Sequence, residues 1–307
     1  MAKPSPKRKT TVEKTANKVS EVKQAALLKH TKAQIKELQL SLFDLASWAD
    51  GMRAMPNDIA RAALFTTRNK KTPREVRQQH VIFHVQKNVL ITYTGIELRA
   101  DDDDLVWQQV LEYAKRSPIG TPVSFTFYVL CTDLGCGRSM AANYDKAEDC
   151  LTRLQATAMQ FSSGRIGRLE SVSLINRFRV LDRGKKTSRC QIEIVEEIVV
   201  LFAGDHYPKF VWEKYRELSP TARRMFDYFV SHKDPFPLKL ETFRLMCGSD
   251  SSRVKKWREQ TGQACDELSK SGLVQLSWVQ SDAILLQAIV VLVDMRPTMG
   301  AAAPVFH

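Results

Sequence analysis

The stretch that decides the fold is SSRVKKWREQTGQACDELS, residues 251–269. Apolar and small residues recur in it at intervals of three and four, which predicts a helix that buries this stripe: Val254, Trp257, Thr261, Ala264 and Leu268. Gly272 ends the helix, because glycine readily adopts the left-handed backbone that closes one. Residues 273–279 and 283–291 then predict a hairpin. A short helix at 239–246, a turn, this long helix and the hairpin together indicate a winged helix.

The same order of elements is predicted upstream. A hairpin at 81–85 and 89–93 and a short helix at 59–65 come first, followed by an apolar stretch at 122–134. Residues 143–159 then predict an amphipathic helix whose inward side chains are Ala147, Cys150, Leu151, Leu154 and Ala158. Strands are expected at 171–181, 188–195 and 198–202. The second unit opens with a helix from Pro220 to Val230, which Ser219 caps.

These patterns predict an α+β fold of two tandem winged-helix domains preceded by a disordered basic N-terminal arm. The arm contains ten Lys or Arg, two Glu and no aromatic residue, a composition that cannot build a core. The predicted boundaries are 1–36 for the arm, 37–51 for a docking segment, 52–204 for the first domain, 205–298 for the second domain and 299–307 for a tail.

Charge and composition narrow the class of partner. The 307 residues carry a net charge of +12, and the pI is about 9.4. Such a balance indicates a polyanionic partner, most often nucleic acid. No apolar run approaches the roughly 20 residues that span a bilayer, and the N-terminus lacks the apolar centre of a signal peptide. Six scattered cysteines without a C-x-x-C motif indicate reduced thiols. We therefore expect a cytoplasmic protein without a membrane partner.

The long helix of the second unit is the clearest candidate reader of duplex DNA. Between Ser251 and Arg258 there are four cations and no anion, and major-groove readers carry long donors in this half of the helix. Arg253 or Arg258 suits guanine, Gln263 suits adenine, and Glu259 can accept from cytosine. The predicted contacts are Ser252, Arg253, Lys255, Lys256, Arg258, Glu259 and Gln263. The alternative is a solvated basic face on a helix that only packs.

In the first unit the predicted DNA contacts lie on the long helix and on a basic wing. Residues 165–189 contain eight Lys or Arg and only two acidic residues, Glu170 and Asp182. A basic wing can follow the phosphate backbone or enter the minor groove. The predicted contacts of this unit are Arg138, Lys146, Arg153, Arg165, Arg168, Arg183, Lys185 and Lys186.

Catalytic and metal-binding patterns are weak. Asp101, Asp102, Asp103 and Asp104 precede a predicted helix, where carboxylates oppose the positive end of the macrodipole, so a metal site is the less favoured interpretation. His80 and His84 lie four apart in a predicted strand and lack a third ligand. There is no phosphate-binding G-x-x-x-x-G-K-[ST] motif. We predict no enzymatic activity, no metal and no cofactor.

Upstream of both units lies the pentapeptide Gln39-Leu40-Ser41-Leu42-Phe43. Its glutamine amide supplies a directed hydrogen bond, and its leucine and phenylalanine supply area to bury in a pocket. It resembles the docking motif by which bacterial replication proteins bind the DNA polymerase sliding clamp. Self-packing is the alternative, because apolar residues around it also recur at roughly helical spacing: Leu27, Leu28, Ile35, Leu38, Leu42 and Leu45.

Three stretches carry a family resemblance: QLSLFD at 39–44, WADGMR at 48–53 and LSPTAR at 218–223. With them the chain from about Gln39 onward resembles TrfA-type replication initiator proteins of broad-host-range plasmids. The resemblance implies two winged-helix domains that bind repeated sites (iterons) in double-stranded origin DNA. It also implies opening of adjacent AT-rich DNA, contact with its single strands, recruitment of the host helicase, initiator and sliding clamp, and control of copy number. A homodimer in equilibrium with an active monomer is a further trait of the family.

Two other functions use parts of the same evidence. A winged-helix transcription regulator would use the same helices but would not need a docking peptide for the clamp. A strand-nicking enzyme is the third possibility, but the sequence lacks the His-x-His motif expected on one strand of such an enzyme. Both alternative functions would also have DNA as the partner of the basic surface.

Overall fold

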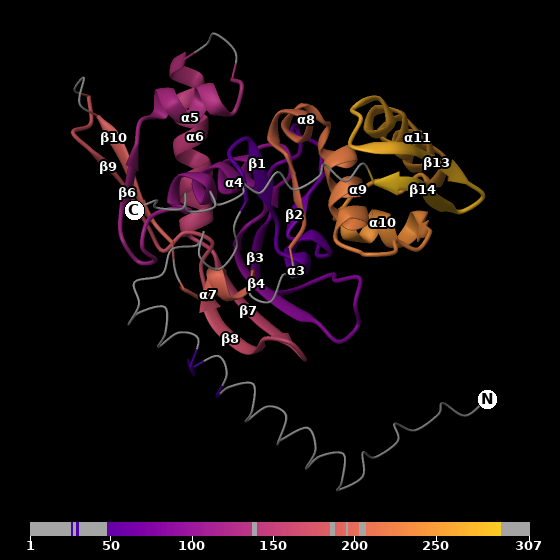
Figure 1. Ribbon diagram of the computed structural model, residues 1–307, viewed down its shortest axis with the longest axis horizontal. Coiled ribbons are helices and arrows are strands. Elements are labelled where there is room, and N and C mark those ends of the chain that lie inside the picture. Colours follow the sequence, from indigo (N-terminus) through magenta and orange to yellow (C-terminus); the bar gives the residue numbers. More distant parts are fainter. Residues whose placement is uncertain are drawn as a thin grey trace, which may run out of the picture.

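The computed structural model describes Ala26, Lys29, His30 and residues 48–136, 140–184, 188–194, 196–202 and 207–289. Several sequence predictions lie outside these residues: most of the arm, the pentapeptide from Gln39 to Phe43, the tail, Arg138, Lys185 and Lys186. The described part is a mixed α and β structure in which two helix-rich units lie at opposite ends (Figure 1). One contains α5 and α6, and the other contains α9, α10 and α11.

A four-stranded antiparallel sheet, ordered β3-β4-β7-β8, lies beside the first unit. Its strands are β3 (Val76–Ile82), β4 (Leu90–Ile96), β7 (Ala158–Ser163) and β8 (Gly167–Val172). The predicted hairpin at 81–93 is confirmed as β3 and β4. Ile91, Tyr93, Met159 and Phe161 are buried on one face of the sheet, as the alternation of a half-buried strand requires.

The first unit combines three helices with a second sheet, ordered β6-β10-β9. Its elements in chain order are α4 (Asp103–Ala114), β6 (Val123–Phe125), α5 (Phe127–Asp133), α6 (Met140–Gln155), β9 (Arg177–Leu181) and β10 (Arg189–Glu193). Cys190 pairs with Phe125 on one side and with Val180 on the other. The hairpin of β7 and β8 is therefore an insertion between α6 and β9 that joins a different sheet.

The second unit repeats this arrangement without the insertion. Its elements are α9 (Pro220–Val230), β12 (Leu238–Lys239), α10 (Leu240–Met246), α11 (Val254–Lys270), β13 (Val274–Gln280) and β14 (Ala283–Ile289). The sheet order β12-β14-β13 matches β6-β10-β9. The predicted cap is confirmed, because Ser219 Oγ accepts from the Ala222 amide and Pro220 begins α9.

Short elements connect the two units. β1 (Met52–Ala54) pairs with β11 (Lys209–Val211), and β2 (Phe65–Thr66) pairs in parallel with β5 (Leu98–Arg99). α3 (Asn57–Ala60), α7 (Glu196–Val200) and α8 (Trp212–Glu217) complete the described elements. Phe210 on β11 contacts Tyr215 on α8 and Phe226 on α9, so one aromatic cluster runs from the centre into the second unit.

Several details of the sequence prediction are wrong, among them the short helix expected at 59–65, which is α3 at Asn57–Ala60. Residues 198–202, expected as a strand, begin in α7, and all five are buried, so the run has no period that separates strand from helix. The strand expected at 171–181 is two strands, β8 and β9, in different sheets. Ala158, expected inward on α6, is exposed on β7. Val254 is 77% exposed, and the buried stripe of α11 begins one turn later and includes Cys265.

Candidate nucleic-acid interface

The candidate interface is built on the start of α11. Trp257 anchors it, since its ring lies 5.4 Å from that of Phe243 and its Nε1 donates to the Leu240 carbonyl over 3.0 Å. Arg253 precedes the helix in an extended conformation, and its carbonyl accepts from the Trp257 amide. The helix therefore begins at Val254, not at Ser251 as expected. With Trp257 fixed on α10, the side chains on the opposite face project outward.

All seven predicted contacts on and before this helix are exposed: Ser252, Arg253, Lys255, Lys256, Arg258, Glu259 and Gln263. The first turn of α11 contains no acidic residue. Free amide groups give the first turn of a helix a partial positive charge, and three cations within one turn of it add to that charge: Arg253, Lys255 and Lys256. Among the described residues none of these three is in an ion pair. This end of α11 can therefore accept an extended anion such as a phosphate backbone.

Arg258, which is also predicted to read guanine, makes a contact within the protein. Its Nη1 donates to the carbonyl of Ser281 in the turn between β13 and β14. Ser281 has a φ of 49°, so this turn is tight. Arg258 therefore links the helix to the tip of the hairpin, which leaves Arg253 as the better candidate for guanine recognition.

The equivalent helix of the first unit has the opposite charge. α6 carries Asp145, Glu148 and Asp149 against only Lys146 and Arg153. Asp145 and Asp149 are exposed. Like charge repels the phosphate backbone, so this helix offers no cationic face to a duplex.

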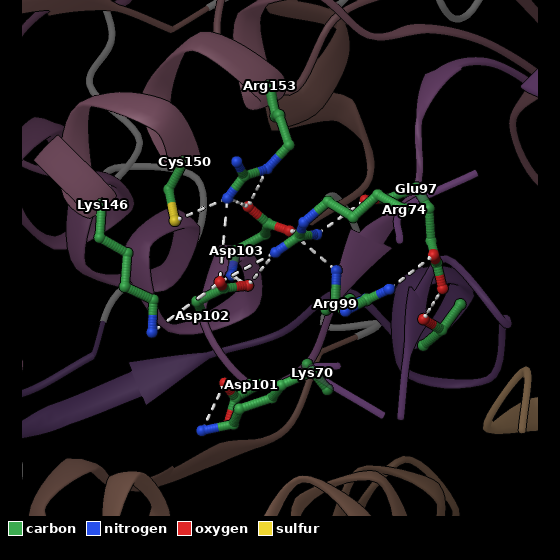
Figure 2. A network of polar contacts seen from close by, with 12 residues as sticks. Lys70, Arg74, Glu97, Arg99, Asp101, Asp102, Asp103, Lys146, Cys150 and Arg153 are labelled. Atoms are coloured by element: carbon green, nitrogen blue, oxygen red, sulfur yellow. Dashed lines mark hydrogen bonds and ion pairs between the residues drawn. The ribbon is translucent and has the colours of Figure 1, made fainter. Parts of the chain in front are cut away.

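Arg153, predicted as a DNA contact, is instead part of a half-buried ion network (Figure 2). Its guanidinium lies 2.8 Å from Asp103 Oδ1 and 3.8 Å from Asp102 Oδ2, and its side chain is 13% exposed. Arg74 reaches the same two carboxylates from the other side, at 2.8 Å and 2.6 Å. The prediction for Arg153 is corrected, because releasing it would leave two buried carboxylates with Arg74 as the one guanidinium between them.

The network shifts the pKa values of its carboxyls in opposite directions. Burial disfavours ionisation of Asp102, but Arg74 and then Arg153 outweigh burial and hold its pKa below the ordinary value. The pKa of Asp103 is raised by burial and by the neighbouring Asp102. The ligand atoms of Asp102, Asp103 and Cys150 lie within 4.8 Å of one another. Two guanidinium groups already contact these carboxylates, so the set is an ion network and not a vacant metal site.

The other predicted cations of the first unit do not form one surface. Lys146 is 53% exposed and lies 4.0 Å from Asp102. Arg165 points toward α3, where its Nη2 contacts Asp58 at 2.6 Å, so its prediction is corrected as well. Arg168 on β8 is 71% exposed and pairs with Glu170. Because β8 belongs to the four-stranded sheet, Arg168 lies on a different sheet from the predicted wing.

The hairpin of β9 and β10 carries the basic surface of this unit. Arg183, in its turn, is 66% exposed and makes a two-point ion pair with Glu148 on α6. Three further arginines on the two strands are exposed, and none is in an ion pair in the described part of the chain: Arg177, Arg179 and Arg189. They were not among the predicted contacts. The alternation of arginine with Phe178 and Val180 was the signal that could have found them.

The hairpin of the second unit, unlike that of the first, carries no basic side chains. Residues 274–289, which include β13, β14 and their turn, contain no lysine or arginine. Its outer face is apolar and amide-rich, and Leu276 is 46% exposed. In the second unit the candidate cations therefore lie on α11 and not on its hairpin.

The two histidines singled out in the sequence do not share a face. His80 is exposed on β3, whereas His84 is buried, and its Nδ1 lies 3.0 Å from the Gln86 amide. β3 ends at Ile82, so His84 lies beyond the strand, in an isolated bridge with Ala62, and outside the alternation that places His80. They do not form the start of a metal site.

Comparison with known proteins places the chain in a family. The sequence profile described as TrfA protein matches residues 7–287. The chain belongs to the TrfA family. One TrfA relative, described as plasmid replication initiator protein TrfA from Escherichia coli, is 74% identical over 278 residues, which are 91% of this chain and 72% of the relative.

Solved structures show a more distant likeness. A crystal structure of domains 2 and 3 of RctB aligns with a TM-score of 0.48 and 11% identity, over 69% of this chain and 85% of that one. A second RctB structure, of residues 155–483, aligns with a TM-score of 0.47 and 12% identity, over 74% and 94% of the two chains. Within the part of this TrfA-family chain that the structure describes, no helix has the length and hydrophobicity needed to cross a bilayer.

Proposed function

We propose that this protein initiates plasmid replication by binding repeated sites in double-stranded origin DNA. The observation that carries the proposal is the exposed start of α11, where Arg253, Lys255 and Lys256 have no acidic partner among the described residues. Membership of the TrfA family supplies the biological setting, because a 74% identical relative is a plasmid replication initiator.

Both units are proposed to be winged-helix domains. Each runs helix, short strand, helix, long helix and hairpin, and each sheet places the last strand in the centre. In such domains the long helix enters the major groove and the hairpin acts as a wing against the backbone or the minor groove. The arrangement supports α11 as the reader of base edges and the hairpin of β9 and β10 as the wing that contacts phosphate.

Opening of adjacent AT-rich DNA would then use binding free energy and not ATP. The chain has no phosphate-binding loop motif. Bending a duplex costs of order 1–6 kcal/mol for a modest site, which several bound protomers can supply together. Two DNA-contacting units in one protomer lengthen the footprint along successive grooves.

The partner proposals rest on the sequence. Gln39, Leu40, Ser41, Leu42 and Phe43 form the proposed docking peptide for the bacterial sliding clamp. Single-stranded AT-rich DNA, the host helicase and initiator, and a homodimer that gives an active monomer are proposed from the family resemblance. Copy-number control is proposed on the same basis.

A footprint on a library of double-stranded sites tests the proposal, because it gives the length and spacing of the repeat together. Lys256→Ala should weaken binding to all duplexes and reduce the dependence of log K on log[salt] by about one phosphate contact. Lys270→Ala is the matched control, since Lys270 is an exposed lysine at the other end of α11. Equal losses for the two variants, or no protected repeat, would contradict reading of DNA by the start of α11.

A further inference from the structure

Four consecutive carboxylates at the start of α4 have no part in the proposed DNA contacts. In Figure 1, α4 lies beside α6 in the first unit. Asp102 caps α4, with a side-chain oxygen that accepts from the Asp103 amide. Asp102 and Asp103 pair with cations of α6, whereas Asp104 bonds to Tyr215 on α8. This turn of α4, an element of the first unit, therefore contacts α6 of the same unit and, through Tyr215 on α8, α9 of the second unit.

On the side of the first unit the contacts are ionic. Figure 2 shows Arg153 and Lys146 reaching from α6 to Asp103 and Asp102. Arg153 Nε also donates to Asp103 Oδ1 over 3.0 Å, although the two residues are 50 apart in the sequence. Asp103 is fully buried. These contacts hold α6 against α4.

On the side of the second unit the contacts centre on one phenol. Tyr215 Oη lies 3.1 Å from Asp104 Oδ2 and 3.0 Å from Asp227 Oδ1. Gln108 Nε2 donates to Tyr215 Oη over 3.2 Å and to Asp104 Oδ1 over 2.9 Å. All four side chains are buried, at 1% exposure or less.

Hydrogen atoms in this cluster can be counted. The phenol of Tyr215 has one hydrogen, which it can donate to only one carboxylate. The other carboxyl group lies at hydrogen-bond distance from the same oxygen, so it must carry a hydrogen of its own to make that bond. The two distances at Tyr215 Oη thus fit an arrangement in which one proton is held between Asp104 and Asp227.

Two arginines of α9 hold the cluster against the segments that connect the two units. Arg224 on α9 donates to Asp227 Oδ2 over 2.8 Å and to the carbonyls of Ala60 and Ala62, at 3.0 Å and 2.6 Å. Arg223 donates to the carbonyl of Ala100 in the first half of the chain and to that of Leu218. Cys247, at the end of α10, is the remaining titratable group that interacts with Arg224 and Asp227. These charged and titratable groups come from α4, α8, α9 and the end of α10.

We propose that Asp104, Tyr215 and Asp227 form a proton-dependent latch that positions α11 relative to the first unit. Asp102 and Asp103 hold α6 from the same turn of α4. Thus α4 sets the spacing between the two units that contact DNA. This role rests on the proposed function, because a fixed spacing matters when both units engage one duplex. α9 in turn fixes the position of α11 by two hydrogen bonds. Gln260 on α11 donates to Thr221, and Glu267 on α11 accepts from the Ser219 amide.

The latch closes with a proton bound, which sets the sign of its pH dependence. Burial raises the pKa of Asp104 and raises that of Asp227 to about 7. In the open or unfolded chain both carboxyls ionise near pH 4. The stabilising effect is therefore complete below about pH 4 and is lost as the pH rises through 7, by up to about tenfold in the equilibrium constant per pH unit.

The test measures the distance between the two helices in the full chain without DNA. Spin labels are placed at Asp149→Cys on α6 and Glu259→Cys on α11, in a background where the exposed Cys136 is changed by Cys136→Ser. Electron double resonance then gives the distance distribution at pH 6 and at pH 8.5. The unaltered latch should give a narrow distribution at pH 6 and a broader or shifted one at pH 8.5.

Two variants separate the shared proton from simple packing. Asp227→Asn supplies a permanent N–H to Tyr215 and still accepts from Arg224, so its distribution should be narrow at both pH values. Tyr215→Phe keeps the ring but removes the bridging hydroxyl, so its distribution should be broad at both. If Tyr215→Phe does not fold, Asp104→Asn takes its place, with the same expectation as Asp227→Asn.

The proposal would be overturned if the distance distribution of the unaltered protein did not change between pH 6 and pH 8.5. It would also be overturned if Asp227→Asn showed the same change with pH as the unaltered protein. Because the measurement contains no DNA, such a result counts against the latch alone. Failure to bind repeated sites would instead count against the proposed function alone. A purely structural role for Asp227 predicts loss of stability in Asp227→Asn and not the loss of pH dependence.

Discussion

The long helices α6 and α11 occupy the same place in two units of the same topology, yet they carry opposite charge. α6 has three acidic residues against Lys146 and Arg153, and Arg153 is held in an ion network. α11 begins with cations that have no acidic partner in its first turn. The hairpins reverse the pattern, because β9 and β10 carry exposed arginines and residues 274–289 carry none.

The difference teaches that equal topology does not imply equal contact with DNA. In the second unit the helix supplies the cations, which suits reading of base edges in the major groove. In the first unit the hairpin supplies them, which suits contact with the backbone and no sequence choice. Under the proposed function, the second unit would supply specificity and the first unit affinity.

The largest expected effect is a loss of folding stability on removal of Arg153. Arg153→Ala leaves Asp103 buried beside Asp102 with Arg74 as its remaining partner, so the free energy of unfolding should fall by about 3 kcal/mol. Chemical denaturation measures this loss. Binding to repeated sites, measured where the variant is folded, should change little, and a selective loss of DNA binding without loss of stability would restore Arg153 to the interface.

Arg253 is expected to act on specificity. Arg253→Ala should cost about 1–3 kcal/mol on the specific repeat and spare random duplexes, because bidentate recognition of guanine is worth that much. Titration of both duplexes at one salt concentration measures the ratio. Arg258→Ala serves as the comparison, since Arg258 is committed to Ser281. Equal losses on both duplexes would show that Arg253 contacts phosphate and not bases.

The wing of the first unit is expected to act on affinity alone. Changing Arg177 and Arg179 together to alanine should reduce the salt dependence by about two phosphate contacts, at similar cost on specific and random duplexes. Gln275→Ala and Gln287→Ala, exposed on the second hairpin, should leave it unchanged. A loss confined to the specific repeat would mean that this wing reads sequence.

The smallest expected effect comes from Glu148. Glu148→Gln removes a carboxylate from α6 and releases Arg183 from its ion pair. An exposed pair of this kind contributes about 0.2–1 kcal/mol, so stability should hardly change. Binding to random duplexes should tighten a few-fold at low salt, which filter binding can detect. Weaker binding would show instead that Glu148 holds Arg183 in the orientation that DNA needs.

The sequence by itself determined the local features of this protein. Period, capping and turn residues predicted α11, the cap at Ser219 and the hairpin of β13 and β14, because these depend on neighbours along the chain. The net charge of +12 and the four cations of 251–258 indicated a polyanionic partner, because both are properties of the composition alone. The run at 198–202 could not be assigned, since a segment buried on all sides has no period.

Only the tertiary structure decided which charges remain available for DNA. Arg153 meets Asp103 across 50 residues, and Arg165 meets Asp58 across 107. Nothing local distinguishes these arginines from Arg177 or Arg253, because an ion pair depends on which distant segments the topology brings together. The proton shared by Asp104 and Asp227 has the same origin, since three helices must pack before one phenol can lie between two carboxyl groups.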